Sequence, residues 1–524
     1  MSRIHRFLLW LGFGLHTLLS VHEIARPFLL GHVGWSGAMR GIIARNYLDI
    51  GWAASKLLPY KAMNPIDSPT GPIHWNHPPT VNILTGLSFE VFGQSEWAAQ
   101  LIPVVLAIAC YWIWYALGKT VSPLAGLTAA WIFAFTPMQM EYGRLINYEV
   151  PILFFSLLAL LFFAQKTKRG DTIAVLFMVA AVCVDWSGCF IAAAMGLSLL
   201  LDRRWKAFLA LGLATSSTAA ALFLWLNTVA GGGLITLGKR RATGTTLSQV
   251  WDITSGRFID FFGWPLLILA LVGLIWQLKK PGPEQTFRLH PVNVTFIVGP
   301  LIYFMVFKNA AYVHVFYSLL FMPALIMSGT LGLLAITRGF DWLDPRGQSL
   351  AVALGVMVFL GGVYSNAETL HLRTFSINAE RSPKRNPPYE SRFNEYLATK
   401  WLHDHSGRTD IIATHSSVNL SIQGRYYLHR NVRRVGGLST TGARYLVFAE
   451  RRLSSVQRIK MDREHRTIRF VGYFIVDFEG DANDDIIMNY VAQPPTLTHT
   501  FFVSRIFPPY RLEQKSLAAP SKLK

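Results

Sequence analysis

The chain carries a predominantly apolar stretch at residues 148–165, YEVPILFFSLLALLFFAQ, followed directly by the basic tetrapeptide KTKR at 166–169. An α-helix of about 20 apolar residues spans the hydrocarbon core of a bilayer. Lysine and arginine accumulate in the cytoplasmic loops of membrane proteins. The stretch therefore predicts a transmembrane helix whose C-terminal end faces the cytoplasm.

The composition extends this interpretation to the whole chain. Of its 524 residues, 52% are hydrophobic and only 15% are charged, against roughly 25% charged residues in soluble proteins. The three cysteines, Cys110, Cys183 and Cys189, fall in apolar stretches and are typical of small core residues. These features exclude a disordered chain, a disulfide-rich secreted scaffold and a soluble enzyme, and they favour an integral membrane protein.

Similar apolar stretches predict eleven transmembrane helices. They cover residues 7–26, 98–118, 122–140, 148–165, 172–185, 187–201, 206–229, 258–278, 292–307, 312–336 and 349–366. No cleavage site of small residues follows the first stretch, so we interpret it as a permanent helix and not as a signal peptide.

The basic residues predict an N-terminus in the cytoplasm. With that orientation, four of the five cytoplasmic connections carry two or more basic residues, and the short connections on the other side carry one or none. The alternation leaves three longer segments outside the cytoplasm: 27–97, 230–257 and 367–524. The formal net charge of +19 then has two interpretations, ordinary cytoplasmic loops plus a basic outer domain, or recognition of anionic lipid headgroups. No nucleic-acid motif accompanies it, and we expect no nucleic-acid partner.

The sequence predicts three regions. Residues 1–369 form the transmembrane region, with the first outer loop at 27–97, residues 370–388 a linker, and residues 389–524 an extracytoplasmic domain. Helical periodicity over 391–405, followed by short strand-like runs, predicts an α/β fold for the last region.

The first outer loop is longer than a connector requires. In residues 39–50, apolar side chains recur at helical spacing while Arg40, Arg45 and Asp49 fall away from them, which predicts an amphipathic helix in the membrane interface. The motif His77-Pro78-Pro79 then precedes a second helix-like run at 81–92.

Four short motifs share one order with a known family. They are Ile43-Ala44-Arg45-Asn46-Tyr47-Leu48, His77-Pro78-Pro79, Phe92-Gly93-Gln94-Ser95-Glu96-Trp97-Ala98-Ala99, and Tyr142-Gly143-Arg144 through Glu149, with weaker similarity at Asp185-Trp186 and at His314 with Tyr317. In this order the chain resembles the GT-C superfamily of glycosyltransferases that depend on polyprenyl-phosphate sugars, in the branch of protein mannosyltransferases and the lipid A aminoarabinose transferase.

The resemblance implies a polytopic α-helical, GT-C-like membrane enzyme. Such an enzyme transfers a hexose or pentose, mannose or a related sugar, with inversion. The donor is a polyprenyl-phosphate carrier, and the acceptor is a glycan, lipid or protein outside the cytoplasm. The predicted location is a bacterial inner membrane, with the C-terminal domain outside.

The family's acidic residue in the first loop is missing here, where the chain reads His32-Val33-Gly34-Trp35-Ser36-Gly37. One hypothesis is that His32 replaces it as a base or as a ligand for a divalent cation, Mg²⁺ or Mn²⁺; the other is that His32 only caps the helix. Asp49 is a further candidate base. We assign no metal-ligand set.

Two more catalytic candidates are His77 and Glu149. Two prolines after His77 restrict its backbone, which suits either a site residue or a turn. Glu149 lies at the outer end of an apolar span, where a carboxylate is costly and usually functional, although it also suits the start of a helix. Further candidates for substrate binding are Arg45, Tyr142, Arg144, Lys239, Arg240, Arg241, Arg257, His314 and Tyr317.

The cluster at 239–241 is a candidate for substrate binding because cationic side chains bind phosphate groups. The alternative is that these residues form a solvated loop. His314 is equally typical of a buried core residue.

A second class of function is a flippase for lipid-linked sugars, and a third is a cell-envelope assembly component. Transporters usually show internal repeats and charges in the middle of spans, and we find neither in the sequence.

Overall fold

A computed structural model describes residues 3–516 except 23, 26, 30, 66, 70, 230, 280–288, 339–388, 417, 419, 436–442, 450–464, 471–472, 480–485 and 491–511. The chain divides into two compact units. The first comprises Met1–Arg26, Leu57–Pro59 and Ile73–Ser376, and the second comprises Pro27–Lys56, Tyr60–Pro72 and Ile377–Lys524. The predicted linker at 370–388 lies outside the described residues.

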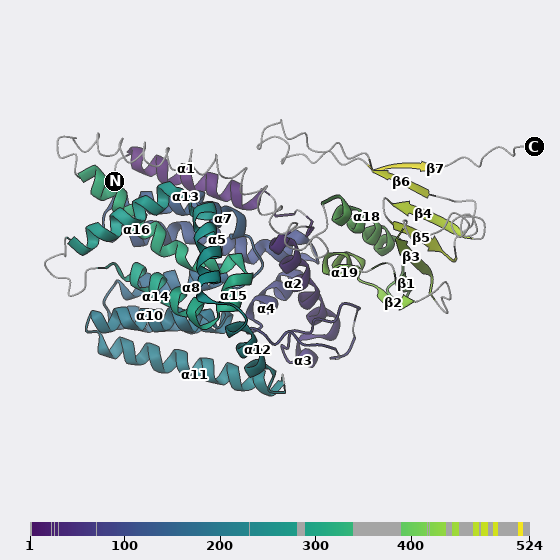
Figure 1. Cartoon of the computed structure of the whole chain (residues 1–524), viewed down its shortest axis with the longest axis horizontal. Helices are drawn as coiled ribbons and strands as arrows, with labels where there is room; N and C mark the ends of the chain where they lie inside the picture. The colour runs from purple at the N-terminus through teal and green to yellow at the C-terminus, as the bar shows by residue number, and fades with distance from the viewer. Residues whose placement is uncertain are drawn as a thin grey trace, which may run out of the picture. The chain divides into compact units, whose positions relative to one another are not determined.

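The first unit is helical (Figure 1). Its elements are α1 (Arg3–Val21), α4 (Thr80–Phe92), α5 (Glu96–Lys119), α6 (Pro123–Phe135), α7 (Pro137–Tyr142), α8 (Glu149–Phe163), α9 (Lys168–Val184), α10 (Ser187–Leu201), α11 (Trp205–Val229), α12 (Gly233–Ala242), α13 (Leu247–Lys279), α14 (Pro291–Val306), α15 (Lys308–Val313), the 3₁₀-helix η1 (Val315–Phe321) and α16 (Met322–Arg338).

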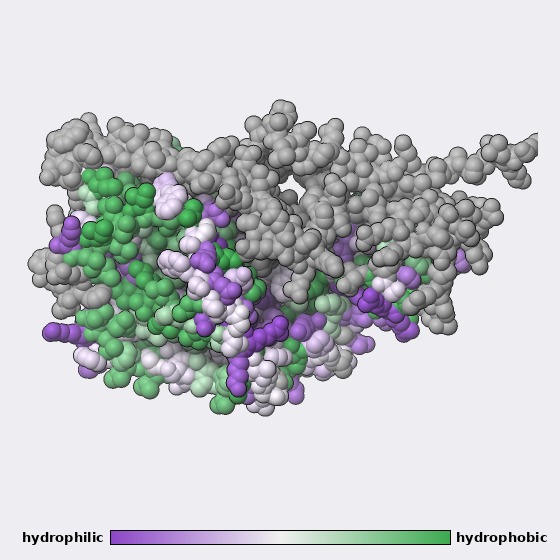
Figure 2. All heavy atoms as spheres, in the orientation of Figure 1, coloured by the Kyte–Doolittle hydropathy of each residue, from purple (hydrophilic) through white to green (hydrophobic). Residues whose placement is uncertain are grey.

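Five helical stretches in the described part of the chain are long and apolar enough to cross a membrane: Arg3–Val21, Glu96–Lys119, Trp205–Val229, Leu247–Lys279 and Val315–Thr337. Figure 2 shows a largely hydrophobic surface over the helices of this unit. The prediction of a helical membrane protein is confirmed. The predicted spans between 7 and 336 overlap described helices, but the span at 122–140 is divided between α6 and α7, and the span at 312–336 is divided among α15, η1 and α16. The predicted span at 349–366 lies outside the described residues.

Hydrogen bonds join chain segments that the basic residues predict to lie on the same side of the membrane. Arg204, in one predicted cytoplasmic connection, donates from Nη1 to the carbonyl of Phe163 beside another, at 2.7 Å. On the predicted outer side, Trp186 Nε1 donates to the carbonyl of Asn76 at 3.0 Å. Each of these two hydrogen bonds therefore joins chain segments that were predicted to lie at the same end of the helices.

Glycines set the contact between α13 and α16. A Cβ atom on Gly273 would lie 1.8 Å from the carbonyl oxygen of Ser328, and one on Gly332 would lie 1.9 Å from that of Leu269. Small residues allow membrane helices to approach this closely, and van der Waals contact then stabilises the pair.

We expect Gly273→Ala to destabilise the first unit, because the new methyl group would collide with backbone that cannot rotate away. Overpacking of this kind costs about 1–3 kcal/mol. Thermal unfolding in lipid nanodiscs measures the effect, and Gly212→Ala is the control because a Cβ there meets nothing within 4 Å. Equal melting temperatures for the two variants would contradict the close packing of α13 and α16.

The second unit contains a mixed seven-stranded sheet of order β2-β1-β3-β5-β4-β6-β7. The strands are β1 (Ile411–His415), β2 (Asn431–Val435), β3 (Tyr445–Ala449), β4 (Arg466–Phe470), β5 (Tyr473–Asp477), β6 (Ile486–Tyr490) and β7 (Leu512–Ser516), and the helices are α2 (Gly31–Ile50), α3 (Trp52–Ser55), α18 (Tyr389–His405) and α19 (Ile422–Leu428). Strand β1 is parallel to β2 and β3, while β5 is antiparallel to β3 and β4. Trp401 of α18 packs with Ile412, Val447 and Ile475 in one buried core. The predicted mixture of helix and strand in this region is confirmed.

Helix α2 differs from the predicted amphipathic interface helix. It packs against α19, so its polar side is covered: Arg40 is 4% exposed and Arg45 is 7% exposed. Arg45 Nη1 donates to the carbonyl of Tyr426 at 2.8 Å, and its guanidinium lies 4.6 Å from the centre of the Tyr426 ring. Arg45 is therefore buried because α19 offers it an acceptor and an aromatic face.

Candidate active site

His77 lies at the centre of a buried polar cluster in the first unit. The two prolines that follow it lead into α4, and the His77 side chain is 7% exposed. Its Nδ1 lies within hydrogen-bonding distance of Oδ1 of Asp185. Asp185 follows the last residue of α9 and is 1% exposed. Two connections far apart in the sequence thus meet in one polar contact.

Arg241, in α12, contacts the other ring nitrogen of His77. Its Nη2 lies 2.7 Å from Nε2 of His77. The neighbouring Lys239 and Arg240 are exposed, and the carbonyl of Arg240 accepts a hydrogen bond from Asn309 at 3.2 Å. Of the three consecutive cations that the sequence suggested as one cluster, only Arg241 turns inward, because successive residues of a helix point in different directions.

Aromatic rings surround the polar cluster. The Tyr148 ring stacks on His77 with 4.2 Å between ring centres. The rings of Tyr303 and Tyr317 lie 5.0 Å apart, and that of His314 lies 5.7 Å from Tyr317. His314 and Tyr317 are both predicted binding residues, and the structure brings them together at the start of η1.

Glu149 is the first residue of α8 and is 1% exposed. Its Oε1 accepts a hydrogen bond from Asn147 Nδ2 at 3.3 Å. The Tyr317 hydroxyl lies within electrostatic range of Glu149, Arg241 and Asp185. The buried site thus combines two carboxylates with a guanidinium and an imidazole.

Both carboxyl oxygens of Asp185 have partners in the site. Its Oδ2 accepts hydrogen bonds from the backbone N and the hydroxyl of Ser187, and its Oδ1 faces Nδ1 of His77. In the sequence, Asp185 belongs only to a weak family similarity, and it is not among the predicted catalytic residues. A carboxylate in a short connection between two apolar helices was the available signal.

Three other predicted binding residues, Arg257, Tyr142 and Arg144, lie in the first unit. Arg257 donates two hydrogen bonds, from Nη1 to the carbonyl of Ala311 at 2.6 Å and from Nη2 to that of Tyr312 at 2.7 Å. Tyr142 is buried at the end of α7, and Arg144 is partly buried in the connection between α7 and α8. Arg257 thus holds the end of α15 in place.

The remaining candidates belong to the second unit. Asp49 pairs with Arg408 at 3.0 Å through Oδ1 and with His429 Nε2 at 3.2 Å through Oδ2. Arg45 contacts Tyr426, as described above. His32 lies in α2, and its side chain is outside the described residues, so its role stays a prediction. The structure brings Asp49 and Arg45 together with α19 and its flanking residues.

The burial of His429 beside Asp49 predicts a loss of stability in acid. Burial lowers the pKa of His429 to about 4, against the opposing effect of its hydrogen bond to Asp49. The unfolded chain, with a pKa near 6.5, therefore binds more protons between pH 6.5 and 4, and stability falls as the pH falls through that window. We expect a loss of about 2 kcal/mol between pH 6.5 and 5. Melting curves of the full chain against pH would measure it, and His429→Gln should flatten the dependence; an unchanged slope in that variant would contradict the assignment.

Among the described residues, no group of three or more His, Cys, Asp or Glu side chains is placed to hold a metal ion. Asp185 is already hydrogen-bonded by His77 and Ser187. The predicted divalent cation stays a prediction, and we assign no step of the chemistry to a metal.

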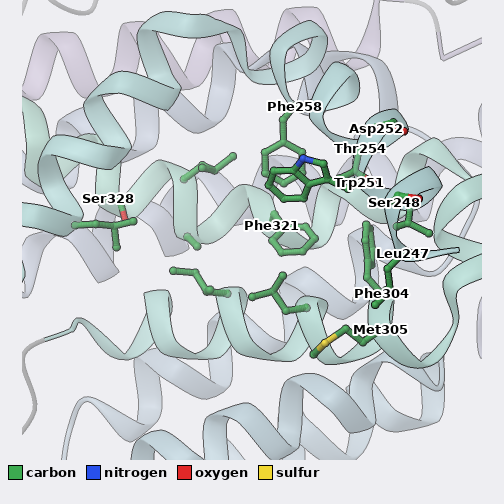
Figure 3. Close-up of a pocket in the computed structure, with 16 residues that line it drawn as sticks. Leu247, Ser248, Trp251, Asp252, Thr254, Phe258, Phe304, Met305, Phe321 and Ser328 are labelled. Carbon is green, nitrogen blue, oxygen red and sulfur yellow. The ribbon is translucent and has the colours of Figure 1, made fainter.

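An apolar cavity of about 640 Å³ lies among α13, α14, η1 and α16 (Figure 3). Phe258, Phe304 and Phe321 line it, and Ser248, Asp252 and Thr254 are polar residues of the same lining. Phe304 adjoins Tyr303, whose ring packs on Tyr317. Phe304 of the cavity lining thus packs against an aromatic ring that also contacts Tyr317.

Two comparisons with known proteins agree with this arrangement. Residues 76–230 match the family described as dolichyl-phosphate-mannose-protein mannosyltransferase. No curated protein sequence matches the chain. The fold is similar to that of ArnT from Cupriavidus metallidurans bound to undecaprenyl phosphate, with a TM-score of 0.57 and 13% identity over 90% of this chain and 98% of that one. The apo state of the same protein gives a TM-score of 0.56 with the same identity and coverage.

The matched residues contain His77, Glu149 and Asp185, and the likeness in fold extends over most of both chains. The resemblance predicted from the sequence is thereby confirmed. Residues 76–230 of the chain resemble the dolichyl-phosphate-mannose-protein mannosyltransferase family, and the chain as a whole has a fold similar to that of ArnT.

Proposed function

We propose that this chain transfers a sugar from a polyprenyl-phosphate carrier to an acceptor outside the cytoplasm. The observation that carries the proposal is the contact of Arg241 with His77 in a buried site that also holds Glu149. A guanidinium binds phosphate oxygens through paired hydrogen bonds. A buried carboxylate in the same site is suited to accept a proton from the attacking group.

The reaction follows from these roles. An acceptor hydroxyl attacks the anomeric carbon, and a bond forms between them as the bond from that carbon to the phosphate oxygen breaks. Glu149 takes the hydroxyl proton. Arg241, with His77, stabilises the negative charge that grows on the departing phosphate. Attack on the side opposite the phosphate inverts the anomeric configuration.

The apolar cavity supports the same donor. A polyprenyl chain has no polar group to satisfy, so a lining of aromatic and aliphatic side chains such as Phe304 and Phe321 suits it. We propose that the cavity holds part of this chain while the phosphate reaches Arg241. The crystal structure of ArnT with undecaprenyl phosphate supports a lipid of this chemistry.

The proposal includes the topology predicted from the sequence. The chain would cross a bacterial inner membrane about eleven times, with its N-terminus in the cytoplasm and the C-terminal unit outside. Mannose or a related hexose or pentose is the proposed sugar, and a glycan, lipid or protein is the acceptor. His32 remains a second proposed base. For Asp49 we propose a structural role, because Arg408 and His429 already bind both of its oxygens.

The test uses purified full-length protein in lipid nanodiscs and a polyprenyl-phosphate sugar labelled in the sugar. We expect loss of label from the donor, to an acceptor or to water, together with accumulation of polyprenyl phosphate. Movement of intact donor across a liposome membrane without release of the phosphate would support the flippase alternative and would contradict the transferase.

A further inference from the structure

Asp185 is held rigidly before any ligand binds. Its Oδ2 accepts hydrogen bonds from the backbone N of Ser187 at 3.1 Å and from the Ser187 hydroxyl at 2.7 Å. Its Oδ1 faces Nδ1 of His77. Because both oxygens have partners and the side chain is buried, the carboxylate cannot rotate away from the imidazole without losing these hydrogen bonds.

The second ring nitrogen of His77 determines where its proton lies. Nε2 is 2.7 Å from Nη2 of Arg241, and a guanidinium only donates hydrogen bonds. Nε2 must therefore accept, which leaves the single proton of a neutral imidazole on Nδ1, where it is donated to Asp185. In this arrangement Arg241 carries the positive charge and His77 is neutral.

Other groups around His77 leave this assignment unchanged. The ring faces Tyr148 on α8 at 4.2 Å between ring centres and His74 at 6.2 Å. Tyr303 and Tyr317 act electrostatically on Arg241. A carboxylate beside Nδ1 stabilises the doubly protonated ring, so protonation of Nε2 is opposed mainly by the neighbouring guanidinium.

We propose that Asp185 is a positioning residue that holds His77 so that Nε2 takes up a proton when a lipid phosphate draws Arg241 away. The hydrogen bond from Arg241 to Nε2 breaks, and Arg241 donates to a phosphate oxygen instead. Nε2 gains one proton from solvent and donates it in a hydrogen bond to the same phosphate. Binding of the phosphate thus consumes one proton, and this inference rests on the proposed function.

The test measures the affinity of purified full-length protein in nanodiscs for undecaprenyl phosphate across pH 5.5–8.5 (a range of about one unit or more on either side of the histidine pKa of about 6.5). We expect the wild-type affinity to fall as the pH rises, since protonated His77 is lost. His77→Lys supplies a fixed cation, so its profile retains only the titration of the phosphate itself and serves as the matched control.

Asp185→Asn removes the charge that stabilises protonated His77. We expect affinity at neutral pH about tenfold to a hundredfold weaker and a midpoint at lower pH than in the wild type, with Asp185→Glu restoring part of both. A merely structural Asp185 would lower the melting temperature and leave the midpoint unchanged, which would overturn the inference. If Asp185→Asn does not fold, identical pH profiles for the wild type and His77→Lys would still overturn it. Absence of any binding to the wild type would instead overturn the proposed donor site.

Discussion

Replacement of Arg241 by alanine is expected to reduce sugar transfer about 10²- to 10³-fold. The guanidinium is the only group of the three consecutive cations that reaches His77 in the described structure. Its removal leaves the growing charge of the departing phosphate without its strongest donor. Turnover of a labelled polyprenyl-phosphate sugar by the full-length protein in nanodiscs measures the loss.

Arg240→Ala provides the matched control for this variant. Arg240 stands on the same helix, one residue away, and is exposed; its contact with Asn309 uses the backbone carbonyl, which alanine retains. We expect nearly wild-type turnover from it. Equal losses in both variants would mean that the basic helix acts only through its overall charge, and the assignment of Arg241 would be wrong.

Replacement of Glu149 by glutamine is expected to lower turnover about 10²- to 10⁴-fold, the usual contribution of a general base. Glutamine keeps the size of the side chain and can still accept from Asn147, so the fold should survive. Binding of undecaprenyl phosphate should change little, because the departing phosphate is held by Arg241. A loss of turnover without a loss of undecaprenyl phosphate binding would identify Glu149 as the general base.

The alternative for Glu149 is a favourable charge at a helix start. Glu96 occupies the equivalent place in the first turn of α5, so Glu96→Gln removes the same kind of interaction outside the site. A helix-start charge is worth about 0.3–1 kcal/mol, which affects melting and not chemistry. If both variants lose a little stability and neither loses turnover, Glu149 is not the base.

The sequence predicted the helices well because each apolar stretch must satisfy its own backbone hydrogen bonds in lipid. That requirement is local, so the predicted spans coincide with helices such as α5 and α8. Charge in the connections predicted which of them lie at the same end, and contacts such as Trp186 with Asn76 agree. His77 and Glu149 were predicted as candidates from their local settings, and both lie in or beside the buried polar cluster.

The tertiary structure decided what each polar residue contacts. The sequence could not select Arg241 from its two basic neighbours, because the choice depends on which face of α12 turns toward His77. Asp185 acquired its importance only through a contact with a residue 108 positions away. The sequence predicted a polar side on helix α2 that includes Arg45, but Tyr426 of α19, 381 residues later in the chain, accepts a hydrogen bond from this arginine. Periodicity and composition record the local preference of a segment, whereas the side chains that meet across a site depend on packing between distant segments.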